Sequence, residues 1–355
     1  MPRRSRTVTR LAAGLAATVA LALALGACGP GPGASGPSPS GCCASPGAGT
    51  PQITPLKVGL GYLPSVQFAP FYFAQQAGYY RDAGLDVTFE NKIDPDLVTL
   101  VGQGALDVGV ADGTSVIPAV SQAIPIRYIA TIYGTYPSIV FAKESSGIAS
   151  AADLEGKRIG IPGKYGSSWI ALQALLDSVG LTPDDVTIVL YPEFGQGVAL
   201  QQDAVDAATG FANNEPVQLE LTGSTAIVLH VDDVVALPGP GLIASTATLD
   251  AKHDAVAAFV AATMRAMTEI AADPELGLEA ALVAVPDLSS QRETQAAILD
   301  ATIATWSPVS GGGPFGTIDR DGWEASIAYL ATLDLVPNPV TVDDLVRDDL
   351  LPVQG

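Results

Sequence analysis

Aromatic, amide and hydroxyl side chains gather in four short stretches of this 355-residue chain. The first stretch, residues 61–72, turns at Pro64 and enters a predicted helix. Aromatic rings at the edge of a crevice can stack on a flat solute. The alternative is that rings here pack the helix onto a sheet, which is the interpretation we prefer for Phe73. The candidate binding residues in this stretch are Tyr62, Gln67, Phe68 and Phe71.

The second and third stretches combine backbone N–H groups at helix starts with hydroxyl side chains. Residues 112–115 open a predicted helix, where free N–H groups can hold a polar or anionic group; the alternative is that Asp112 or Thr114 only caps that helix. Residues 163–169 combine conformationally free glycines, hydroxyl donors and an aromatic ring. Lys164 in this stretch could contact an anionic group; the alternative is that it is an ordinary solvated lysine. The candidates are Asp112, Thr114, Tyr165, Ser167 and Ser168.

The fourth stretch, residues 211–216, carries consecutive amides between a predicted strand and a helix. Amides supply both donors and acceptors, which suits the edge of a heterocycle, although amides at a helix start also make ordinary caps. Its candidates are Asn213, Asn214 and Glu215, and four aromatic residues in flanking loops are added to them: Tyr133, Tyr136, Phe194 and Trp306.

Short β-type runs alternate with helical patterns along the chain, which predicts an α/β fold built around mostly parallel sheets. In open α/β sheets the strand ends and helix starts gather in one crevice, so the four stretches are expected to meet there. Strands are predicted at residues 56–61, 85–89, 106–110, 126–133, 158–161, 186–191, 207–211 and 226–231, with a helix at 69–77.

A weak internal repeat divides these elements into two lobes. Residues 103–107 (QGALD) and 202–206 (QDAVD) each precede a predicted strand. We expect residues 56–143 to begin the first lobe, residues 144–235 to form the second, and residues 236–355 to return to the first. The predicted hinge consists of two crossing segments, 139–143 and 234–244.

The first 55 residues have the composition of an export leader and a tether. Four arginines precede an apolar run at residues 11–25, which predicts a signal peptide at residues 1–27. The sequence LGAC that ends this run resembles the lipoprotein box, so Cys28 is the expected lipidation site. The alternatives are an uncleaved amphipathic anchor or an ordinary cleavage nearby, either of which leaves Cys28 a plain thiol. Residues 28–55, rich in Gly, Pro, Ala and Ser, predict a disordered tether.

Composition argues against several other functions. Removing the four leader arginines leaves 13 basic against 37 acidic side chains, a net charge of about −24, which disfavours nucleic acid. The chain after the tether has no Cys and only His230 and His253, so neither a catalytic triad nor a metal site is expected. Residues 160–165 lack P-loop spacing, and acidic pairs such as Asp184 with Asp185 are attributed to solvated turns. We expect no catalytic residue, no metal and no cofactor.

Several of these stretches also carry a family resemblance. Residues 61–64 (GYLP), 78–80 (GYY) and 83–87 (AGLDV), within residues 56–335, resemble the NMT1/THI5-like, also called SsuA/THI5-like, solute-binding proteins of ABC importers. Residues 67–72, 112–113, 163–168 and 213–216 are most similar to the branch assigned to riboflavin import. The resemblance implies a two-lobed periplasmic-binding-protein type II fold that closes on a flat heterocycle between aromatic rings.

The resemblance also implies the partners and the competing functions. It implies a lipid-anchored, extracytoplasmic monomer that delivers its ligand to the permease subunits of an importer. A thiamine pyrimidine precursor is the alternative ligand within the binding class. The related pyrimidine synthases are thought to need a Cys-rich motif and an active-site His, and this chain departs from both. Sulfonate or nitrate binding, known in the wider family, would require more cationic contacts than the sequence offers.

Overall fold

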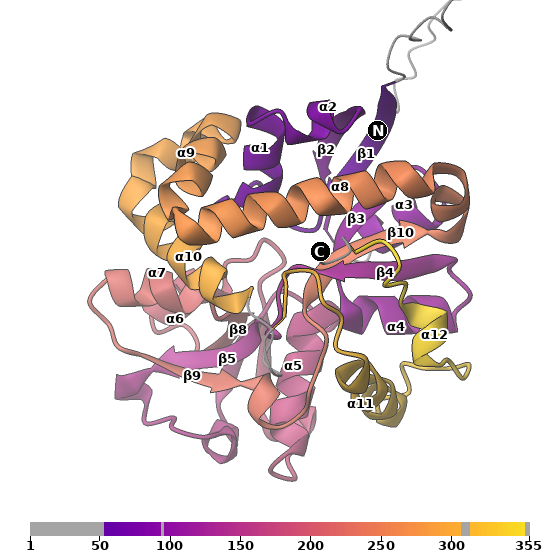
Figure 1. Cartoon of the computed structure of the whole chain (residues 1–355). Coiled ribbons are helices and arrows are strands. Elements are labelled where there is room, and N and C mark those ends of the chain that lie inside the picture. The colour runs from indigo at the N-terminus through magenta and orange to yellow at the C-terminus, as the bar shows by residue number, and fades with distance from the viewer. Residues whose placement is uncertain (1–52, 94–95, 307–312, 352–355) are drawn as a thin grey trace, which may run out of the picture. The chain divides into compact units, whose positions relative to one another are not determined.

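Two five-stranded sheets form the framework of the chain in this computed structural model (Figure 1). The structure describes residues 53–93, 96–306 and 313–351, so the predicted leader, Cys28 and nearly all of the predicted tether lie outside the described residues. The first sheet has the strand order β2-β1-β3-β10-β4, and the second has the order β7-β6-β8-β5-β9.

The strands of the first sheet are β1 (Thr54–Leu60), β2 (Leu85–Asn91), β3 (Val108–Asp112), β4 (Ile126–Thr131) and β10 (Pro240–Ser245). Those of the second are β5 (Ser138–Lys143), β6 (Arg158–Ile161), β7 (Thr187–Leu190), β8 (Ala207–Phe211) and β9 (Ala226–His230). The helices are α1 (Ala69–Gln76), α2 (Tyr79–Asp82), α3 (Asp96–Gly102), α4 (Gly113–Ser121), α5 (Gly166–Asp177), α6 (Gln196–Gln201), α7 (Glu215–Leu221), α8 (Thr246–Ala272), α9 (Pro274–Ala284), α10 (Arg292–Thr305), α11 (Arg320–Thr332) and α12 (Val342–Leu345). All eight predicted strands are present, within three residues at either end.

The two sheets have the same topology. In the first, β1 lies between β2 and β3 and is parallel to both, while β10 is antiparallel to β3 and β4. In the second, β6 lies between its parallel neighbours β7 and β8, and β5 is antiparallel to β8 and β9. The weak internal repeat in the sequence therefore corresponds to two lobes built on one plan.

The aspartates that end the two repeated sequences occupy equivalent places. An oxygen of the Asp107 carboxylate accepts a hydrogen bond from the backbone N–H of Lys57 at 2.9 Å, just before β3. The Asp206 carboxylate accepts one from the backbone N–H of Arg158, also at 2.9 Å, just before β8. Each carboxylate thus joins the start of one strand, β3 or β8, to its parallel neighbour, which explains why both repeats end in Asp.

The crossing segments differ from the prediction at one point. The run 139–143, predicted to cross between lobes, is part of β5 and pairs with β8 and β9 inside the second sheet. The first connection between the sheets is instead residues 132–137, so the second lobe begins before residue 144. The second connection, residues 231–239, lies within or beside the predicted 234–244, whose remainder is β10. An unbroken apolar run is typical of a buried strand in either sheet, so it could not by itself locate the crossing.

Three apolar clusters stabilise the lobes. The first packs α1, α8, α9 and α10 on one face of the first sheet. The second covers the other face, where α11 and α12 pack against α4, and it continues through α4 and α5 into the second lobe. The third lies under α6 and α7. Helix α8 is long and apolar enough to cross a membrane, but its Phe259 and Val260 are fully buried in the first cluster, as expected of a core helix.

Candidate functional site

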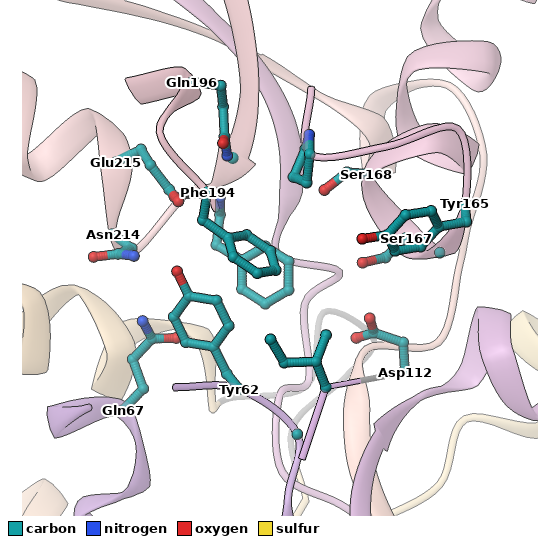
Figure 2. A pocket seen from close by; sticks show the side chains of 16 residues that line it. Tyr62, Gln67, Asp112, Tyr165, Ser167, Ser168, Phe194, Gln196, Asn214 and Glu215 are labelled. Carbon is teal, nitrogen blue, oxygen red and sulfur yellow. Dashed lines mark hydrogen bonds between the residues drawn. The ribbon is translucent and has the colours of Figure 1, made fainter. Parts of the chain in front are cut away.

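A pocket with about 700 Å³ of empty space, part of it open to solvent, lies between the two lobes and is lined by both (Figure 2). The first lobe contributes residues that follow β1 and β2 and the last residue of β3, and the second lobe contributes residues that follow β6 and β7 and residues that end or follow β8. Ligands in open α/β sheets bind outside the carboxyl ends of strands, which is where this pocket lies. A smaller adjoining hollow of about 470 Å³ shares Tyr62, Gln67 and Asp112 with it.

Two aromatic rings meet across the pocket. Tyr62 extends from the first lobe and Phe194 from the second, and their ring centroids are 5.2 Å apart at an interplanar angle of 86°, an edge-to-face contact (Figure 2). Burial, and secondly the nearby carboxyl group of Glu215, raise the pKa of the Tyr62 hydroxyl. The hydroxyl therefore stays protonated and can donate a hydrogen bond at neutral pH.

The loop that carries Tyr62 is held by local contacts. The Ser65 hydroxyl caps a short 3-10 helix at Val66–Phe68 by accepting a hydrogen bond from the backbone N–H of Gln67 at 3.3 Å. Pro70 then occupies the first turn of α1, where its missing N–H removes no helical hydrogen bond. This sequence of turn, cap and helix start places the amide of Gln67 beside Tyr62 in the pocket wall.

A buried carboxyl group lies on the second-lobe side of the pocket. One oxygen of Glu215 accepts a hydrogen bond from the backbone N–H of Phe211 at 2.8 Å. The carboxyl group sits so close to β8 that a methyl group at Gly210 would be 2.9 Å from it, and only glycine leaves this room. Burial raises the pKa of Glu215 and the hydrogen bond from Phe211 lowers it, with burial the larger effect.

The residues that line the pocket include two acids, Asp112 and Glu215, but no Lys, Arg or His among the described part of the chain. The nearby Lys164 places its amino group 5.5 Å from the ring centroid of Trp169 and does not line the pocket. An anionic ligand would therefore find no positively charged side chain among the described lining residues, which is unfavourable in a partly desolvated site. The pocket suits a neutral or cationic ligand that brings hydrogen-bond donors.

The structure brings most of the predicted site residues together. Nine line the main pocket: Tyr62, Gln67, Asp112, Tyr165, Ser167, Ser168, Phe194, Asn214 and Glu215. Phe68 and Tyr133 line the adjoining hollow, and the Tyr133 hydroxyl lies 3.4 Å from Oε1 of Gln67. These eleven residues come from six separate parts of the chain, so they form a possible contact surface for a single ligand.

Five predicted site residues line neither hollow, and each has another role in the fold. Phe71 is 1% exposed and stacks on Phe259 in the first apolar cluster. Thr114 is buried in the first turn of α4. The Tyr136 hydroxyl donates to the carbonyl oxygen of Ser167 at 3.2 Å.

The other two members of this group are an amide and an indole. Asn213 donates from its side-chain amide to the hydroxyl of Thr302 at 2.8 Å. Trp306 is 2% exposed and meets the ring of Phe315 edge-to-face at 6.0 Å. Both side chains make packing contacts, and neither lines the main pocket or the adjoining hollow.

Sequence reasoning missed seven lining residues, which are Gly61, Ile93, Pro162, Gly166, Gln196, Gly210 and Phe211. Most are glycine or apolar residues, which carry no signal of binding. Gln196 is different, because it opens α6 directly after the loop that holds Phe194. The rule that polar residues after strands gather at the crevice would have identified it.

Comparison with known proteins assigns this chain to a family. The family described as NMT1/THI5 like matches residues 65–276, more than half of the chain. The chain belongs to the NMT1/THI5-like family. This membership confirms the resemblance identified from the GYLP, GYY and AGLDV sequences.

Relatives of this NMT1/THI5-like chain carry two kinds of name. The riboflavin-binding protein RibY of Chloroflexus aurantiacus is 31% identical over 311 residues, covering 85% of this chain and 87% of that protein. A 4-amino-5-hydroxymethyl-2-methylpyrimidine phosphate synthase of Legionella pneumophila is 28% identical over 291 residues, covering 80% of this chain and 88% of that protein.

Solved structures establish the fold of this family member. The alkanesulfonate-binding protein SsuA of Xanthomonas axonopodis, bound to MOPS, superimposes with a TM-score of 0.66 at 19% identity, covering 83% of this chain and 98% of that one. Together with the two sheets of equal topology, this likeness shows a two-lobed periplasmic-binding-protein type II fold, as predicted.

Proposed function

We propose that this chain is an extracytoplasmic solute-binding protein that captures riboflavin between its two lobes and delivers it to an ABC importer. The observation that carries the proposal is the pocket itself. It is lined from both lobes, it places Tyr62 and Phe194 ring to ring, it is bordered by the amides of Gln67, Gln196 and Asn214, and no basic side chain is among its described lining residues.

A flat ligand would have to separate the two rings. A planar guest in contact with rings on both faces needs about 7 Å between those rings, because aromatic carbons touch at about 3.5 Å. The Tyr62 and Phe194 centroids are 5.2 Å apart, so the rings occupy the space that such a guest would fill. Ligand binding then replaces one ring contact by two and gains contacts from both lobes, which is the condition for a ligand to favour closure.

Riboflavin fits this environment better than an anion does. Its isoalloxazine ring is flat, it carries no charge, and its sugar-alcohol chain brings hydroxyl donors for Asp112 and Glu215. The relative named for riboflavin binding extends over 85% of the chain and supports the same choice. The nine lining residues predicted from the sequence are proposed as ligand contacts.

A thiamine pyrimidine precursor is the second candidate. It is also flat and bears an amino group that the pocket carboxyl groups could accept, and relatives named as pyrimidine phosphate synthases support it. We propose binding without turnover for either ligand. The described chain has no Cys, and its two histidines lie away from the pocket: His253 is on α8 beside Asp349, and His230 ends β9 at the edge of the second sheet.

The proposed location follows from the leader. We propose that residues 1–27 direct export, that Cys28 carries the lipid, and that residues 28–55 tether the two lobes outside the membrane. The proposed first lobe starts at residue 56, and the proposed exchange with the second lobe occurs at residues 132–137 and 231–239. Mass spectrometry of the mature N-terminus tests this, because an unmodified Cys28 in the membrane fraction contradicts lipidation.

Titration of the purified protein with riboflavin, followed by flavin fluorescence and by melting temperature, tests the ligand. We expect quenching and a higher melting temperature, since a ligand that binds only the native state stabilises it. Phe194→Leu should weaken binding roughly 2- to 13-fold by removing one ring contact. Phe73→Leu is the control, because that ring packs on Tyr79 outside the pocket. No response of the unaltered protein to micromolar riboflavin would refute the flavin ligand.

A further inference from the structure

The side-chain amide of Gln196 has only one stable orientation. Gln196 is the first residue of α6, it is 1% exposed, and its Nε2 donates to the backbone carbonyl oxygen of Thr209 at 3.2 Å. A carbonyl oxygen only accepts hydrogen bonds. Rotating the amide by a half-turn would place Oε1 of Gln196 against the carbonyl oxygen of Thr209, and neither atom could donate. The Oε1 atom must therefore point away from β8.

No described residue donates a hydrogen bond to that Oε1 atom, although the atom is buried. Buried polar atoms are nearly always paired, because an unpaired one loses its hydrogen bonds to water without replacement. Gln196 lines the pocket between the lobes, and Figure 2 shows its amide at the second-lobe wall. An acceptor in this position lacks the partner that a ligand can supply.

A second acceptor lies beside it. A methyl group at Gly197, the next residue along the chain, would be 3.3 Å from Cγ of Glu215, so the start of α6 packs against that glutamate. The carboxyl group of Glu215 also lines the pocket. The wall formed by Gln196 and Glu215 therefore presents acceptors, and it favours a ligand edge that carries N–H donors.

We propose that Gln196 is a specificity-determining residue whose Oε1 atom accepts a hydrogen bond from a ring N–H or amino group of the bound heterocycle. This inference rests on the proposed function. In riboflavin the donor is the single ring N–H of the isoalloxazine, at N3. In the pyrimidine candidate it is the exocyclic amino group. A heterocycle with acceptors alone would bury the Gln196 oxygen unpaired and would be rejected.

The test pairs a change in the protein with a change in the ligand. Riboflavin and N3-methylriboflavin are titrated against the full mature chain and against Gln196→Met, which keeps side-chain length but removes the acceptor. N3-methylation should weaken binding to the unaltered protein by roughly tenfold or more, and it should weaken binding to Gln196→Met far less. Gln202→Met, at the exposed end of the same helix, should behave like the unaltered protein.

The outcomes separate the two proposals. Equal affinity of the unaltered protein for both flavins overturns the role of Gln196 while leaving riboflavin binding intact, and this arm needs no folded variant. The role of Gln196 is also overturned if the losses of binding free energy caused by Gln196→Met and by N3-methylation simply add. If no flavin binds, the flavin proposal fails, and the comparison is repeated with 4-amino-5-hydroxymethyl-2-methylpyrimidine and its analogue without the amino group. Failure of both ligand pairs overturns the role of Gln196 together with the proposed function.

Discussion

The hydrogen bond between Asn213 and Thr302 gives a sharp test of how the lobes are held together. Asn213 follows β8 in the second lobe, whereas Thr302 lies on α10, whose Ile298 and Leu299 pack in the cluster of the first lobe. The two side chains are 1% and 0% exposed, and the amide nitrogen lies 2.8 Å from the hydroxyl oxygen. Separating the lobes must break this bond, so Thr302→Val should favour the open arrangement.

The magnitude can be worked from the contacts. Thr302 also donates to the carbonyl oxygen of Ile298 at 2.7 Å, but that bond lies within α10 and is lost equally in the open and closed forms. What differs is the amide of Asn213, which water can solvate in the open form but which loses its hydrogen bond to Thr302 in the closed form. An unpaired buried amide costs about 1–3 kcal/mol. The ratio of closed to open protein, and with it the apparent ligand affinity, should fall roughly 5- to 150-fold.

Energy transfer between two dyes measures this ratio. Dyes on cysteines placed at the exposed Asp82 and Glu220 report on the separation of the lobes, and the absence of Cys from residues 53–351 leaves only Cys28, Cys42 and Cys43 to replace. Thr302→Ser keeps the hydroxyl and should keep the closed population.

A matched control lies within one lobe. Thr263 is a buried threonine on α8 that also donates to the carbonyl oxygen four residues earlier, at 2.8 Å, and shares a 3.0 Å hydrogen bond with the hydroxyl of Tyr80. Thr263→Val should lower the melting temperature without opening the cleft. An unchanged closed population in Thr302→Val, or an equal shift in Thr263→Val, would refute the reasoning.

Three further outcomes are expected. Riboflavin 5′-phosphate should bind at least about tenfold more weakly than riboflavin, because the carboxyl group of Glu215 has no cation beside it among the described lining residues; equal affinities in a competition titration would contradict this. Gly239→Ala should lower the melting temperature, since its Cβ would lie 2.5 Å from the carbonyl oxygen of Tyr133 in the other crossing segment, and an unchanged melting temperature would count against that packing. Burial raises the pKa of Asp232 to about 6, so its carboxyl group binds its proton more tightly in the folded state, and stability should fall as pH rises from about 4 to 6. Asp232→Asn should remove this fall in urea unfolding, and an identical pH profile would argue otherwise.

Local sequence patterns determined much of the framework. Alternation of β-type and helical runs located eight strands, because residue type and period depend on the immediate chain. The aspartates that end the two repeats indicated two lobes of one plan, since each accepts a backbone hydrogen bond at the same point of its sheet. The rule that ligand contacts follow strand ends selected nine residues that line the pocket.

Tertiary structure alone decided which members of each stretch face the pocket. Asn213 and Asn214 are neighbours of the same type, yet only Asn214 lines the pocket, because Asn213 is turned toward α10, a helix about ninety residues further along the chain. Phe68 and Phe71 are one helical turn apart, and Phe71 is buried against Phe259 from another distant helix.

The position at which the chain passes between the sheets, residues 132–137, was also determined only by the tertiary structure. The apolar run that follows it suits a buried strand in either sheet, and only pairing with β8 and β9 assigns it to the second. Local periodicity depends on neighbours along the chain, whereas the direction a side chain faces depends on partners that folding brings from elsewhere. The sequence therefore determined the elements and the stretches that could bind, and long-range packing determined which side chains line the cleft.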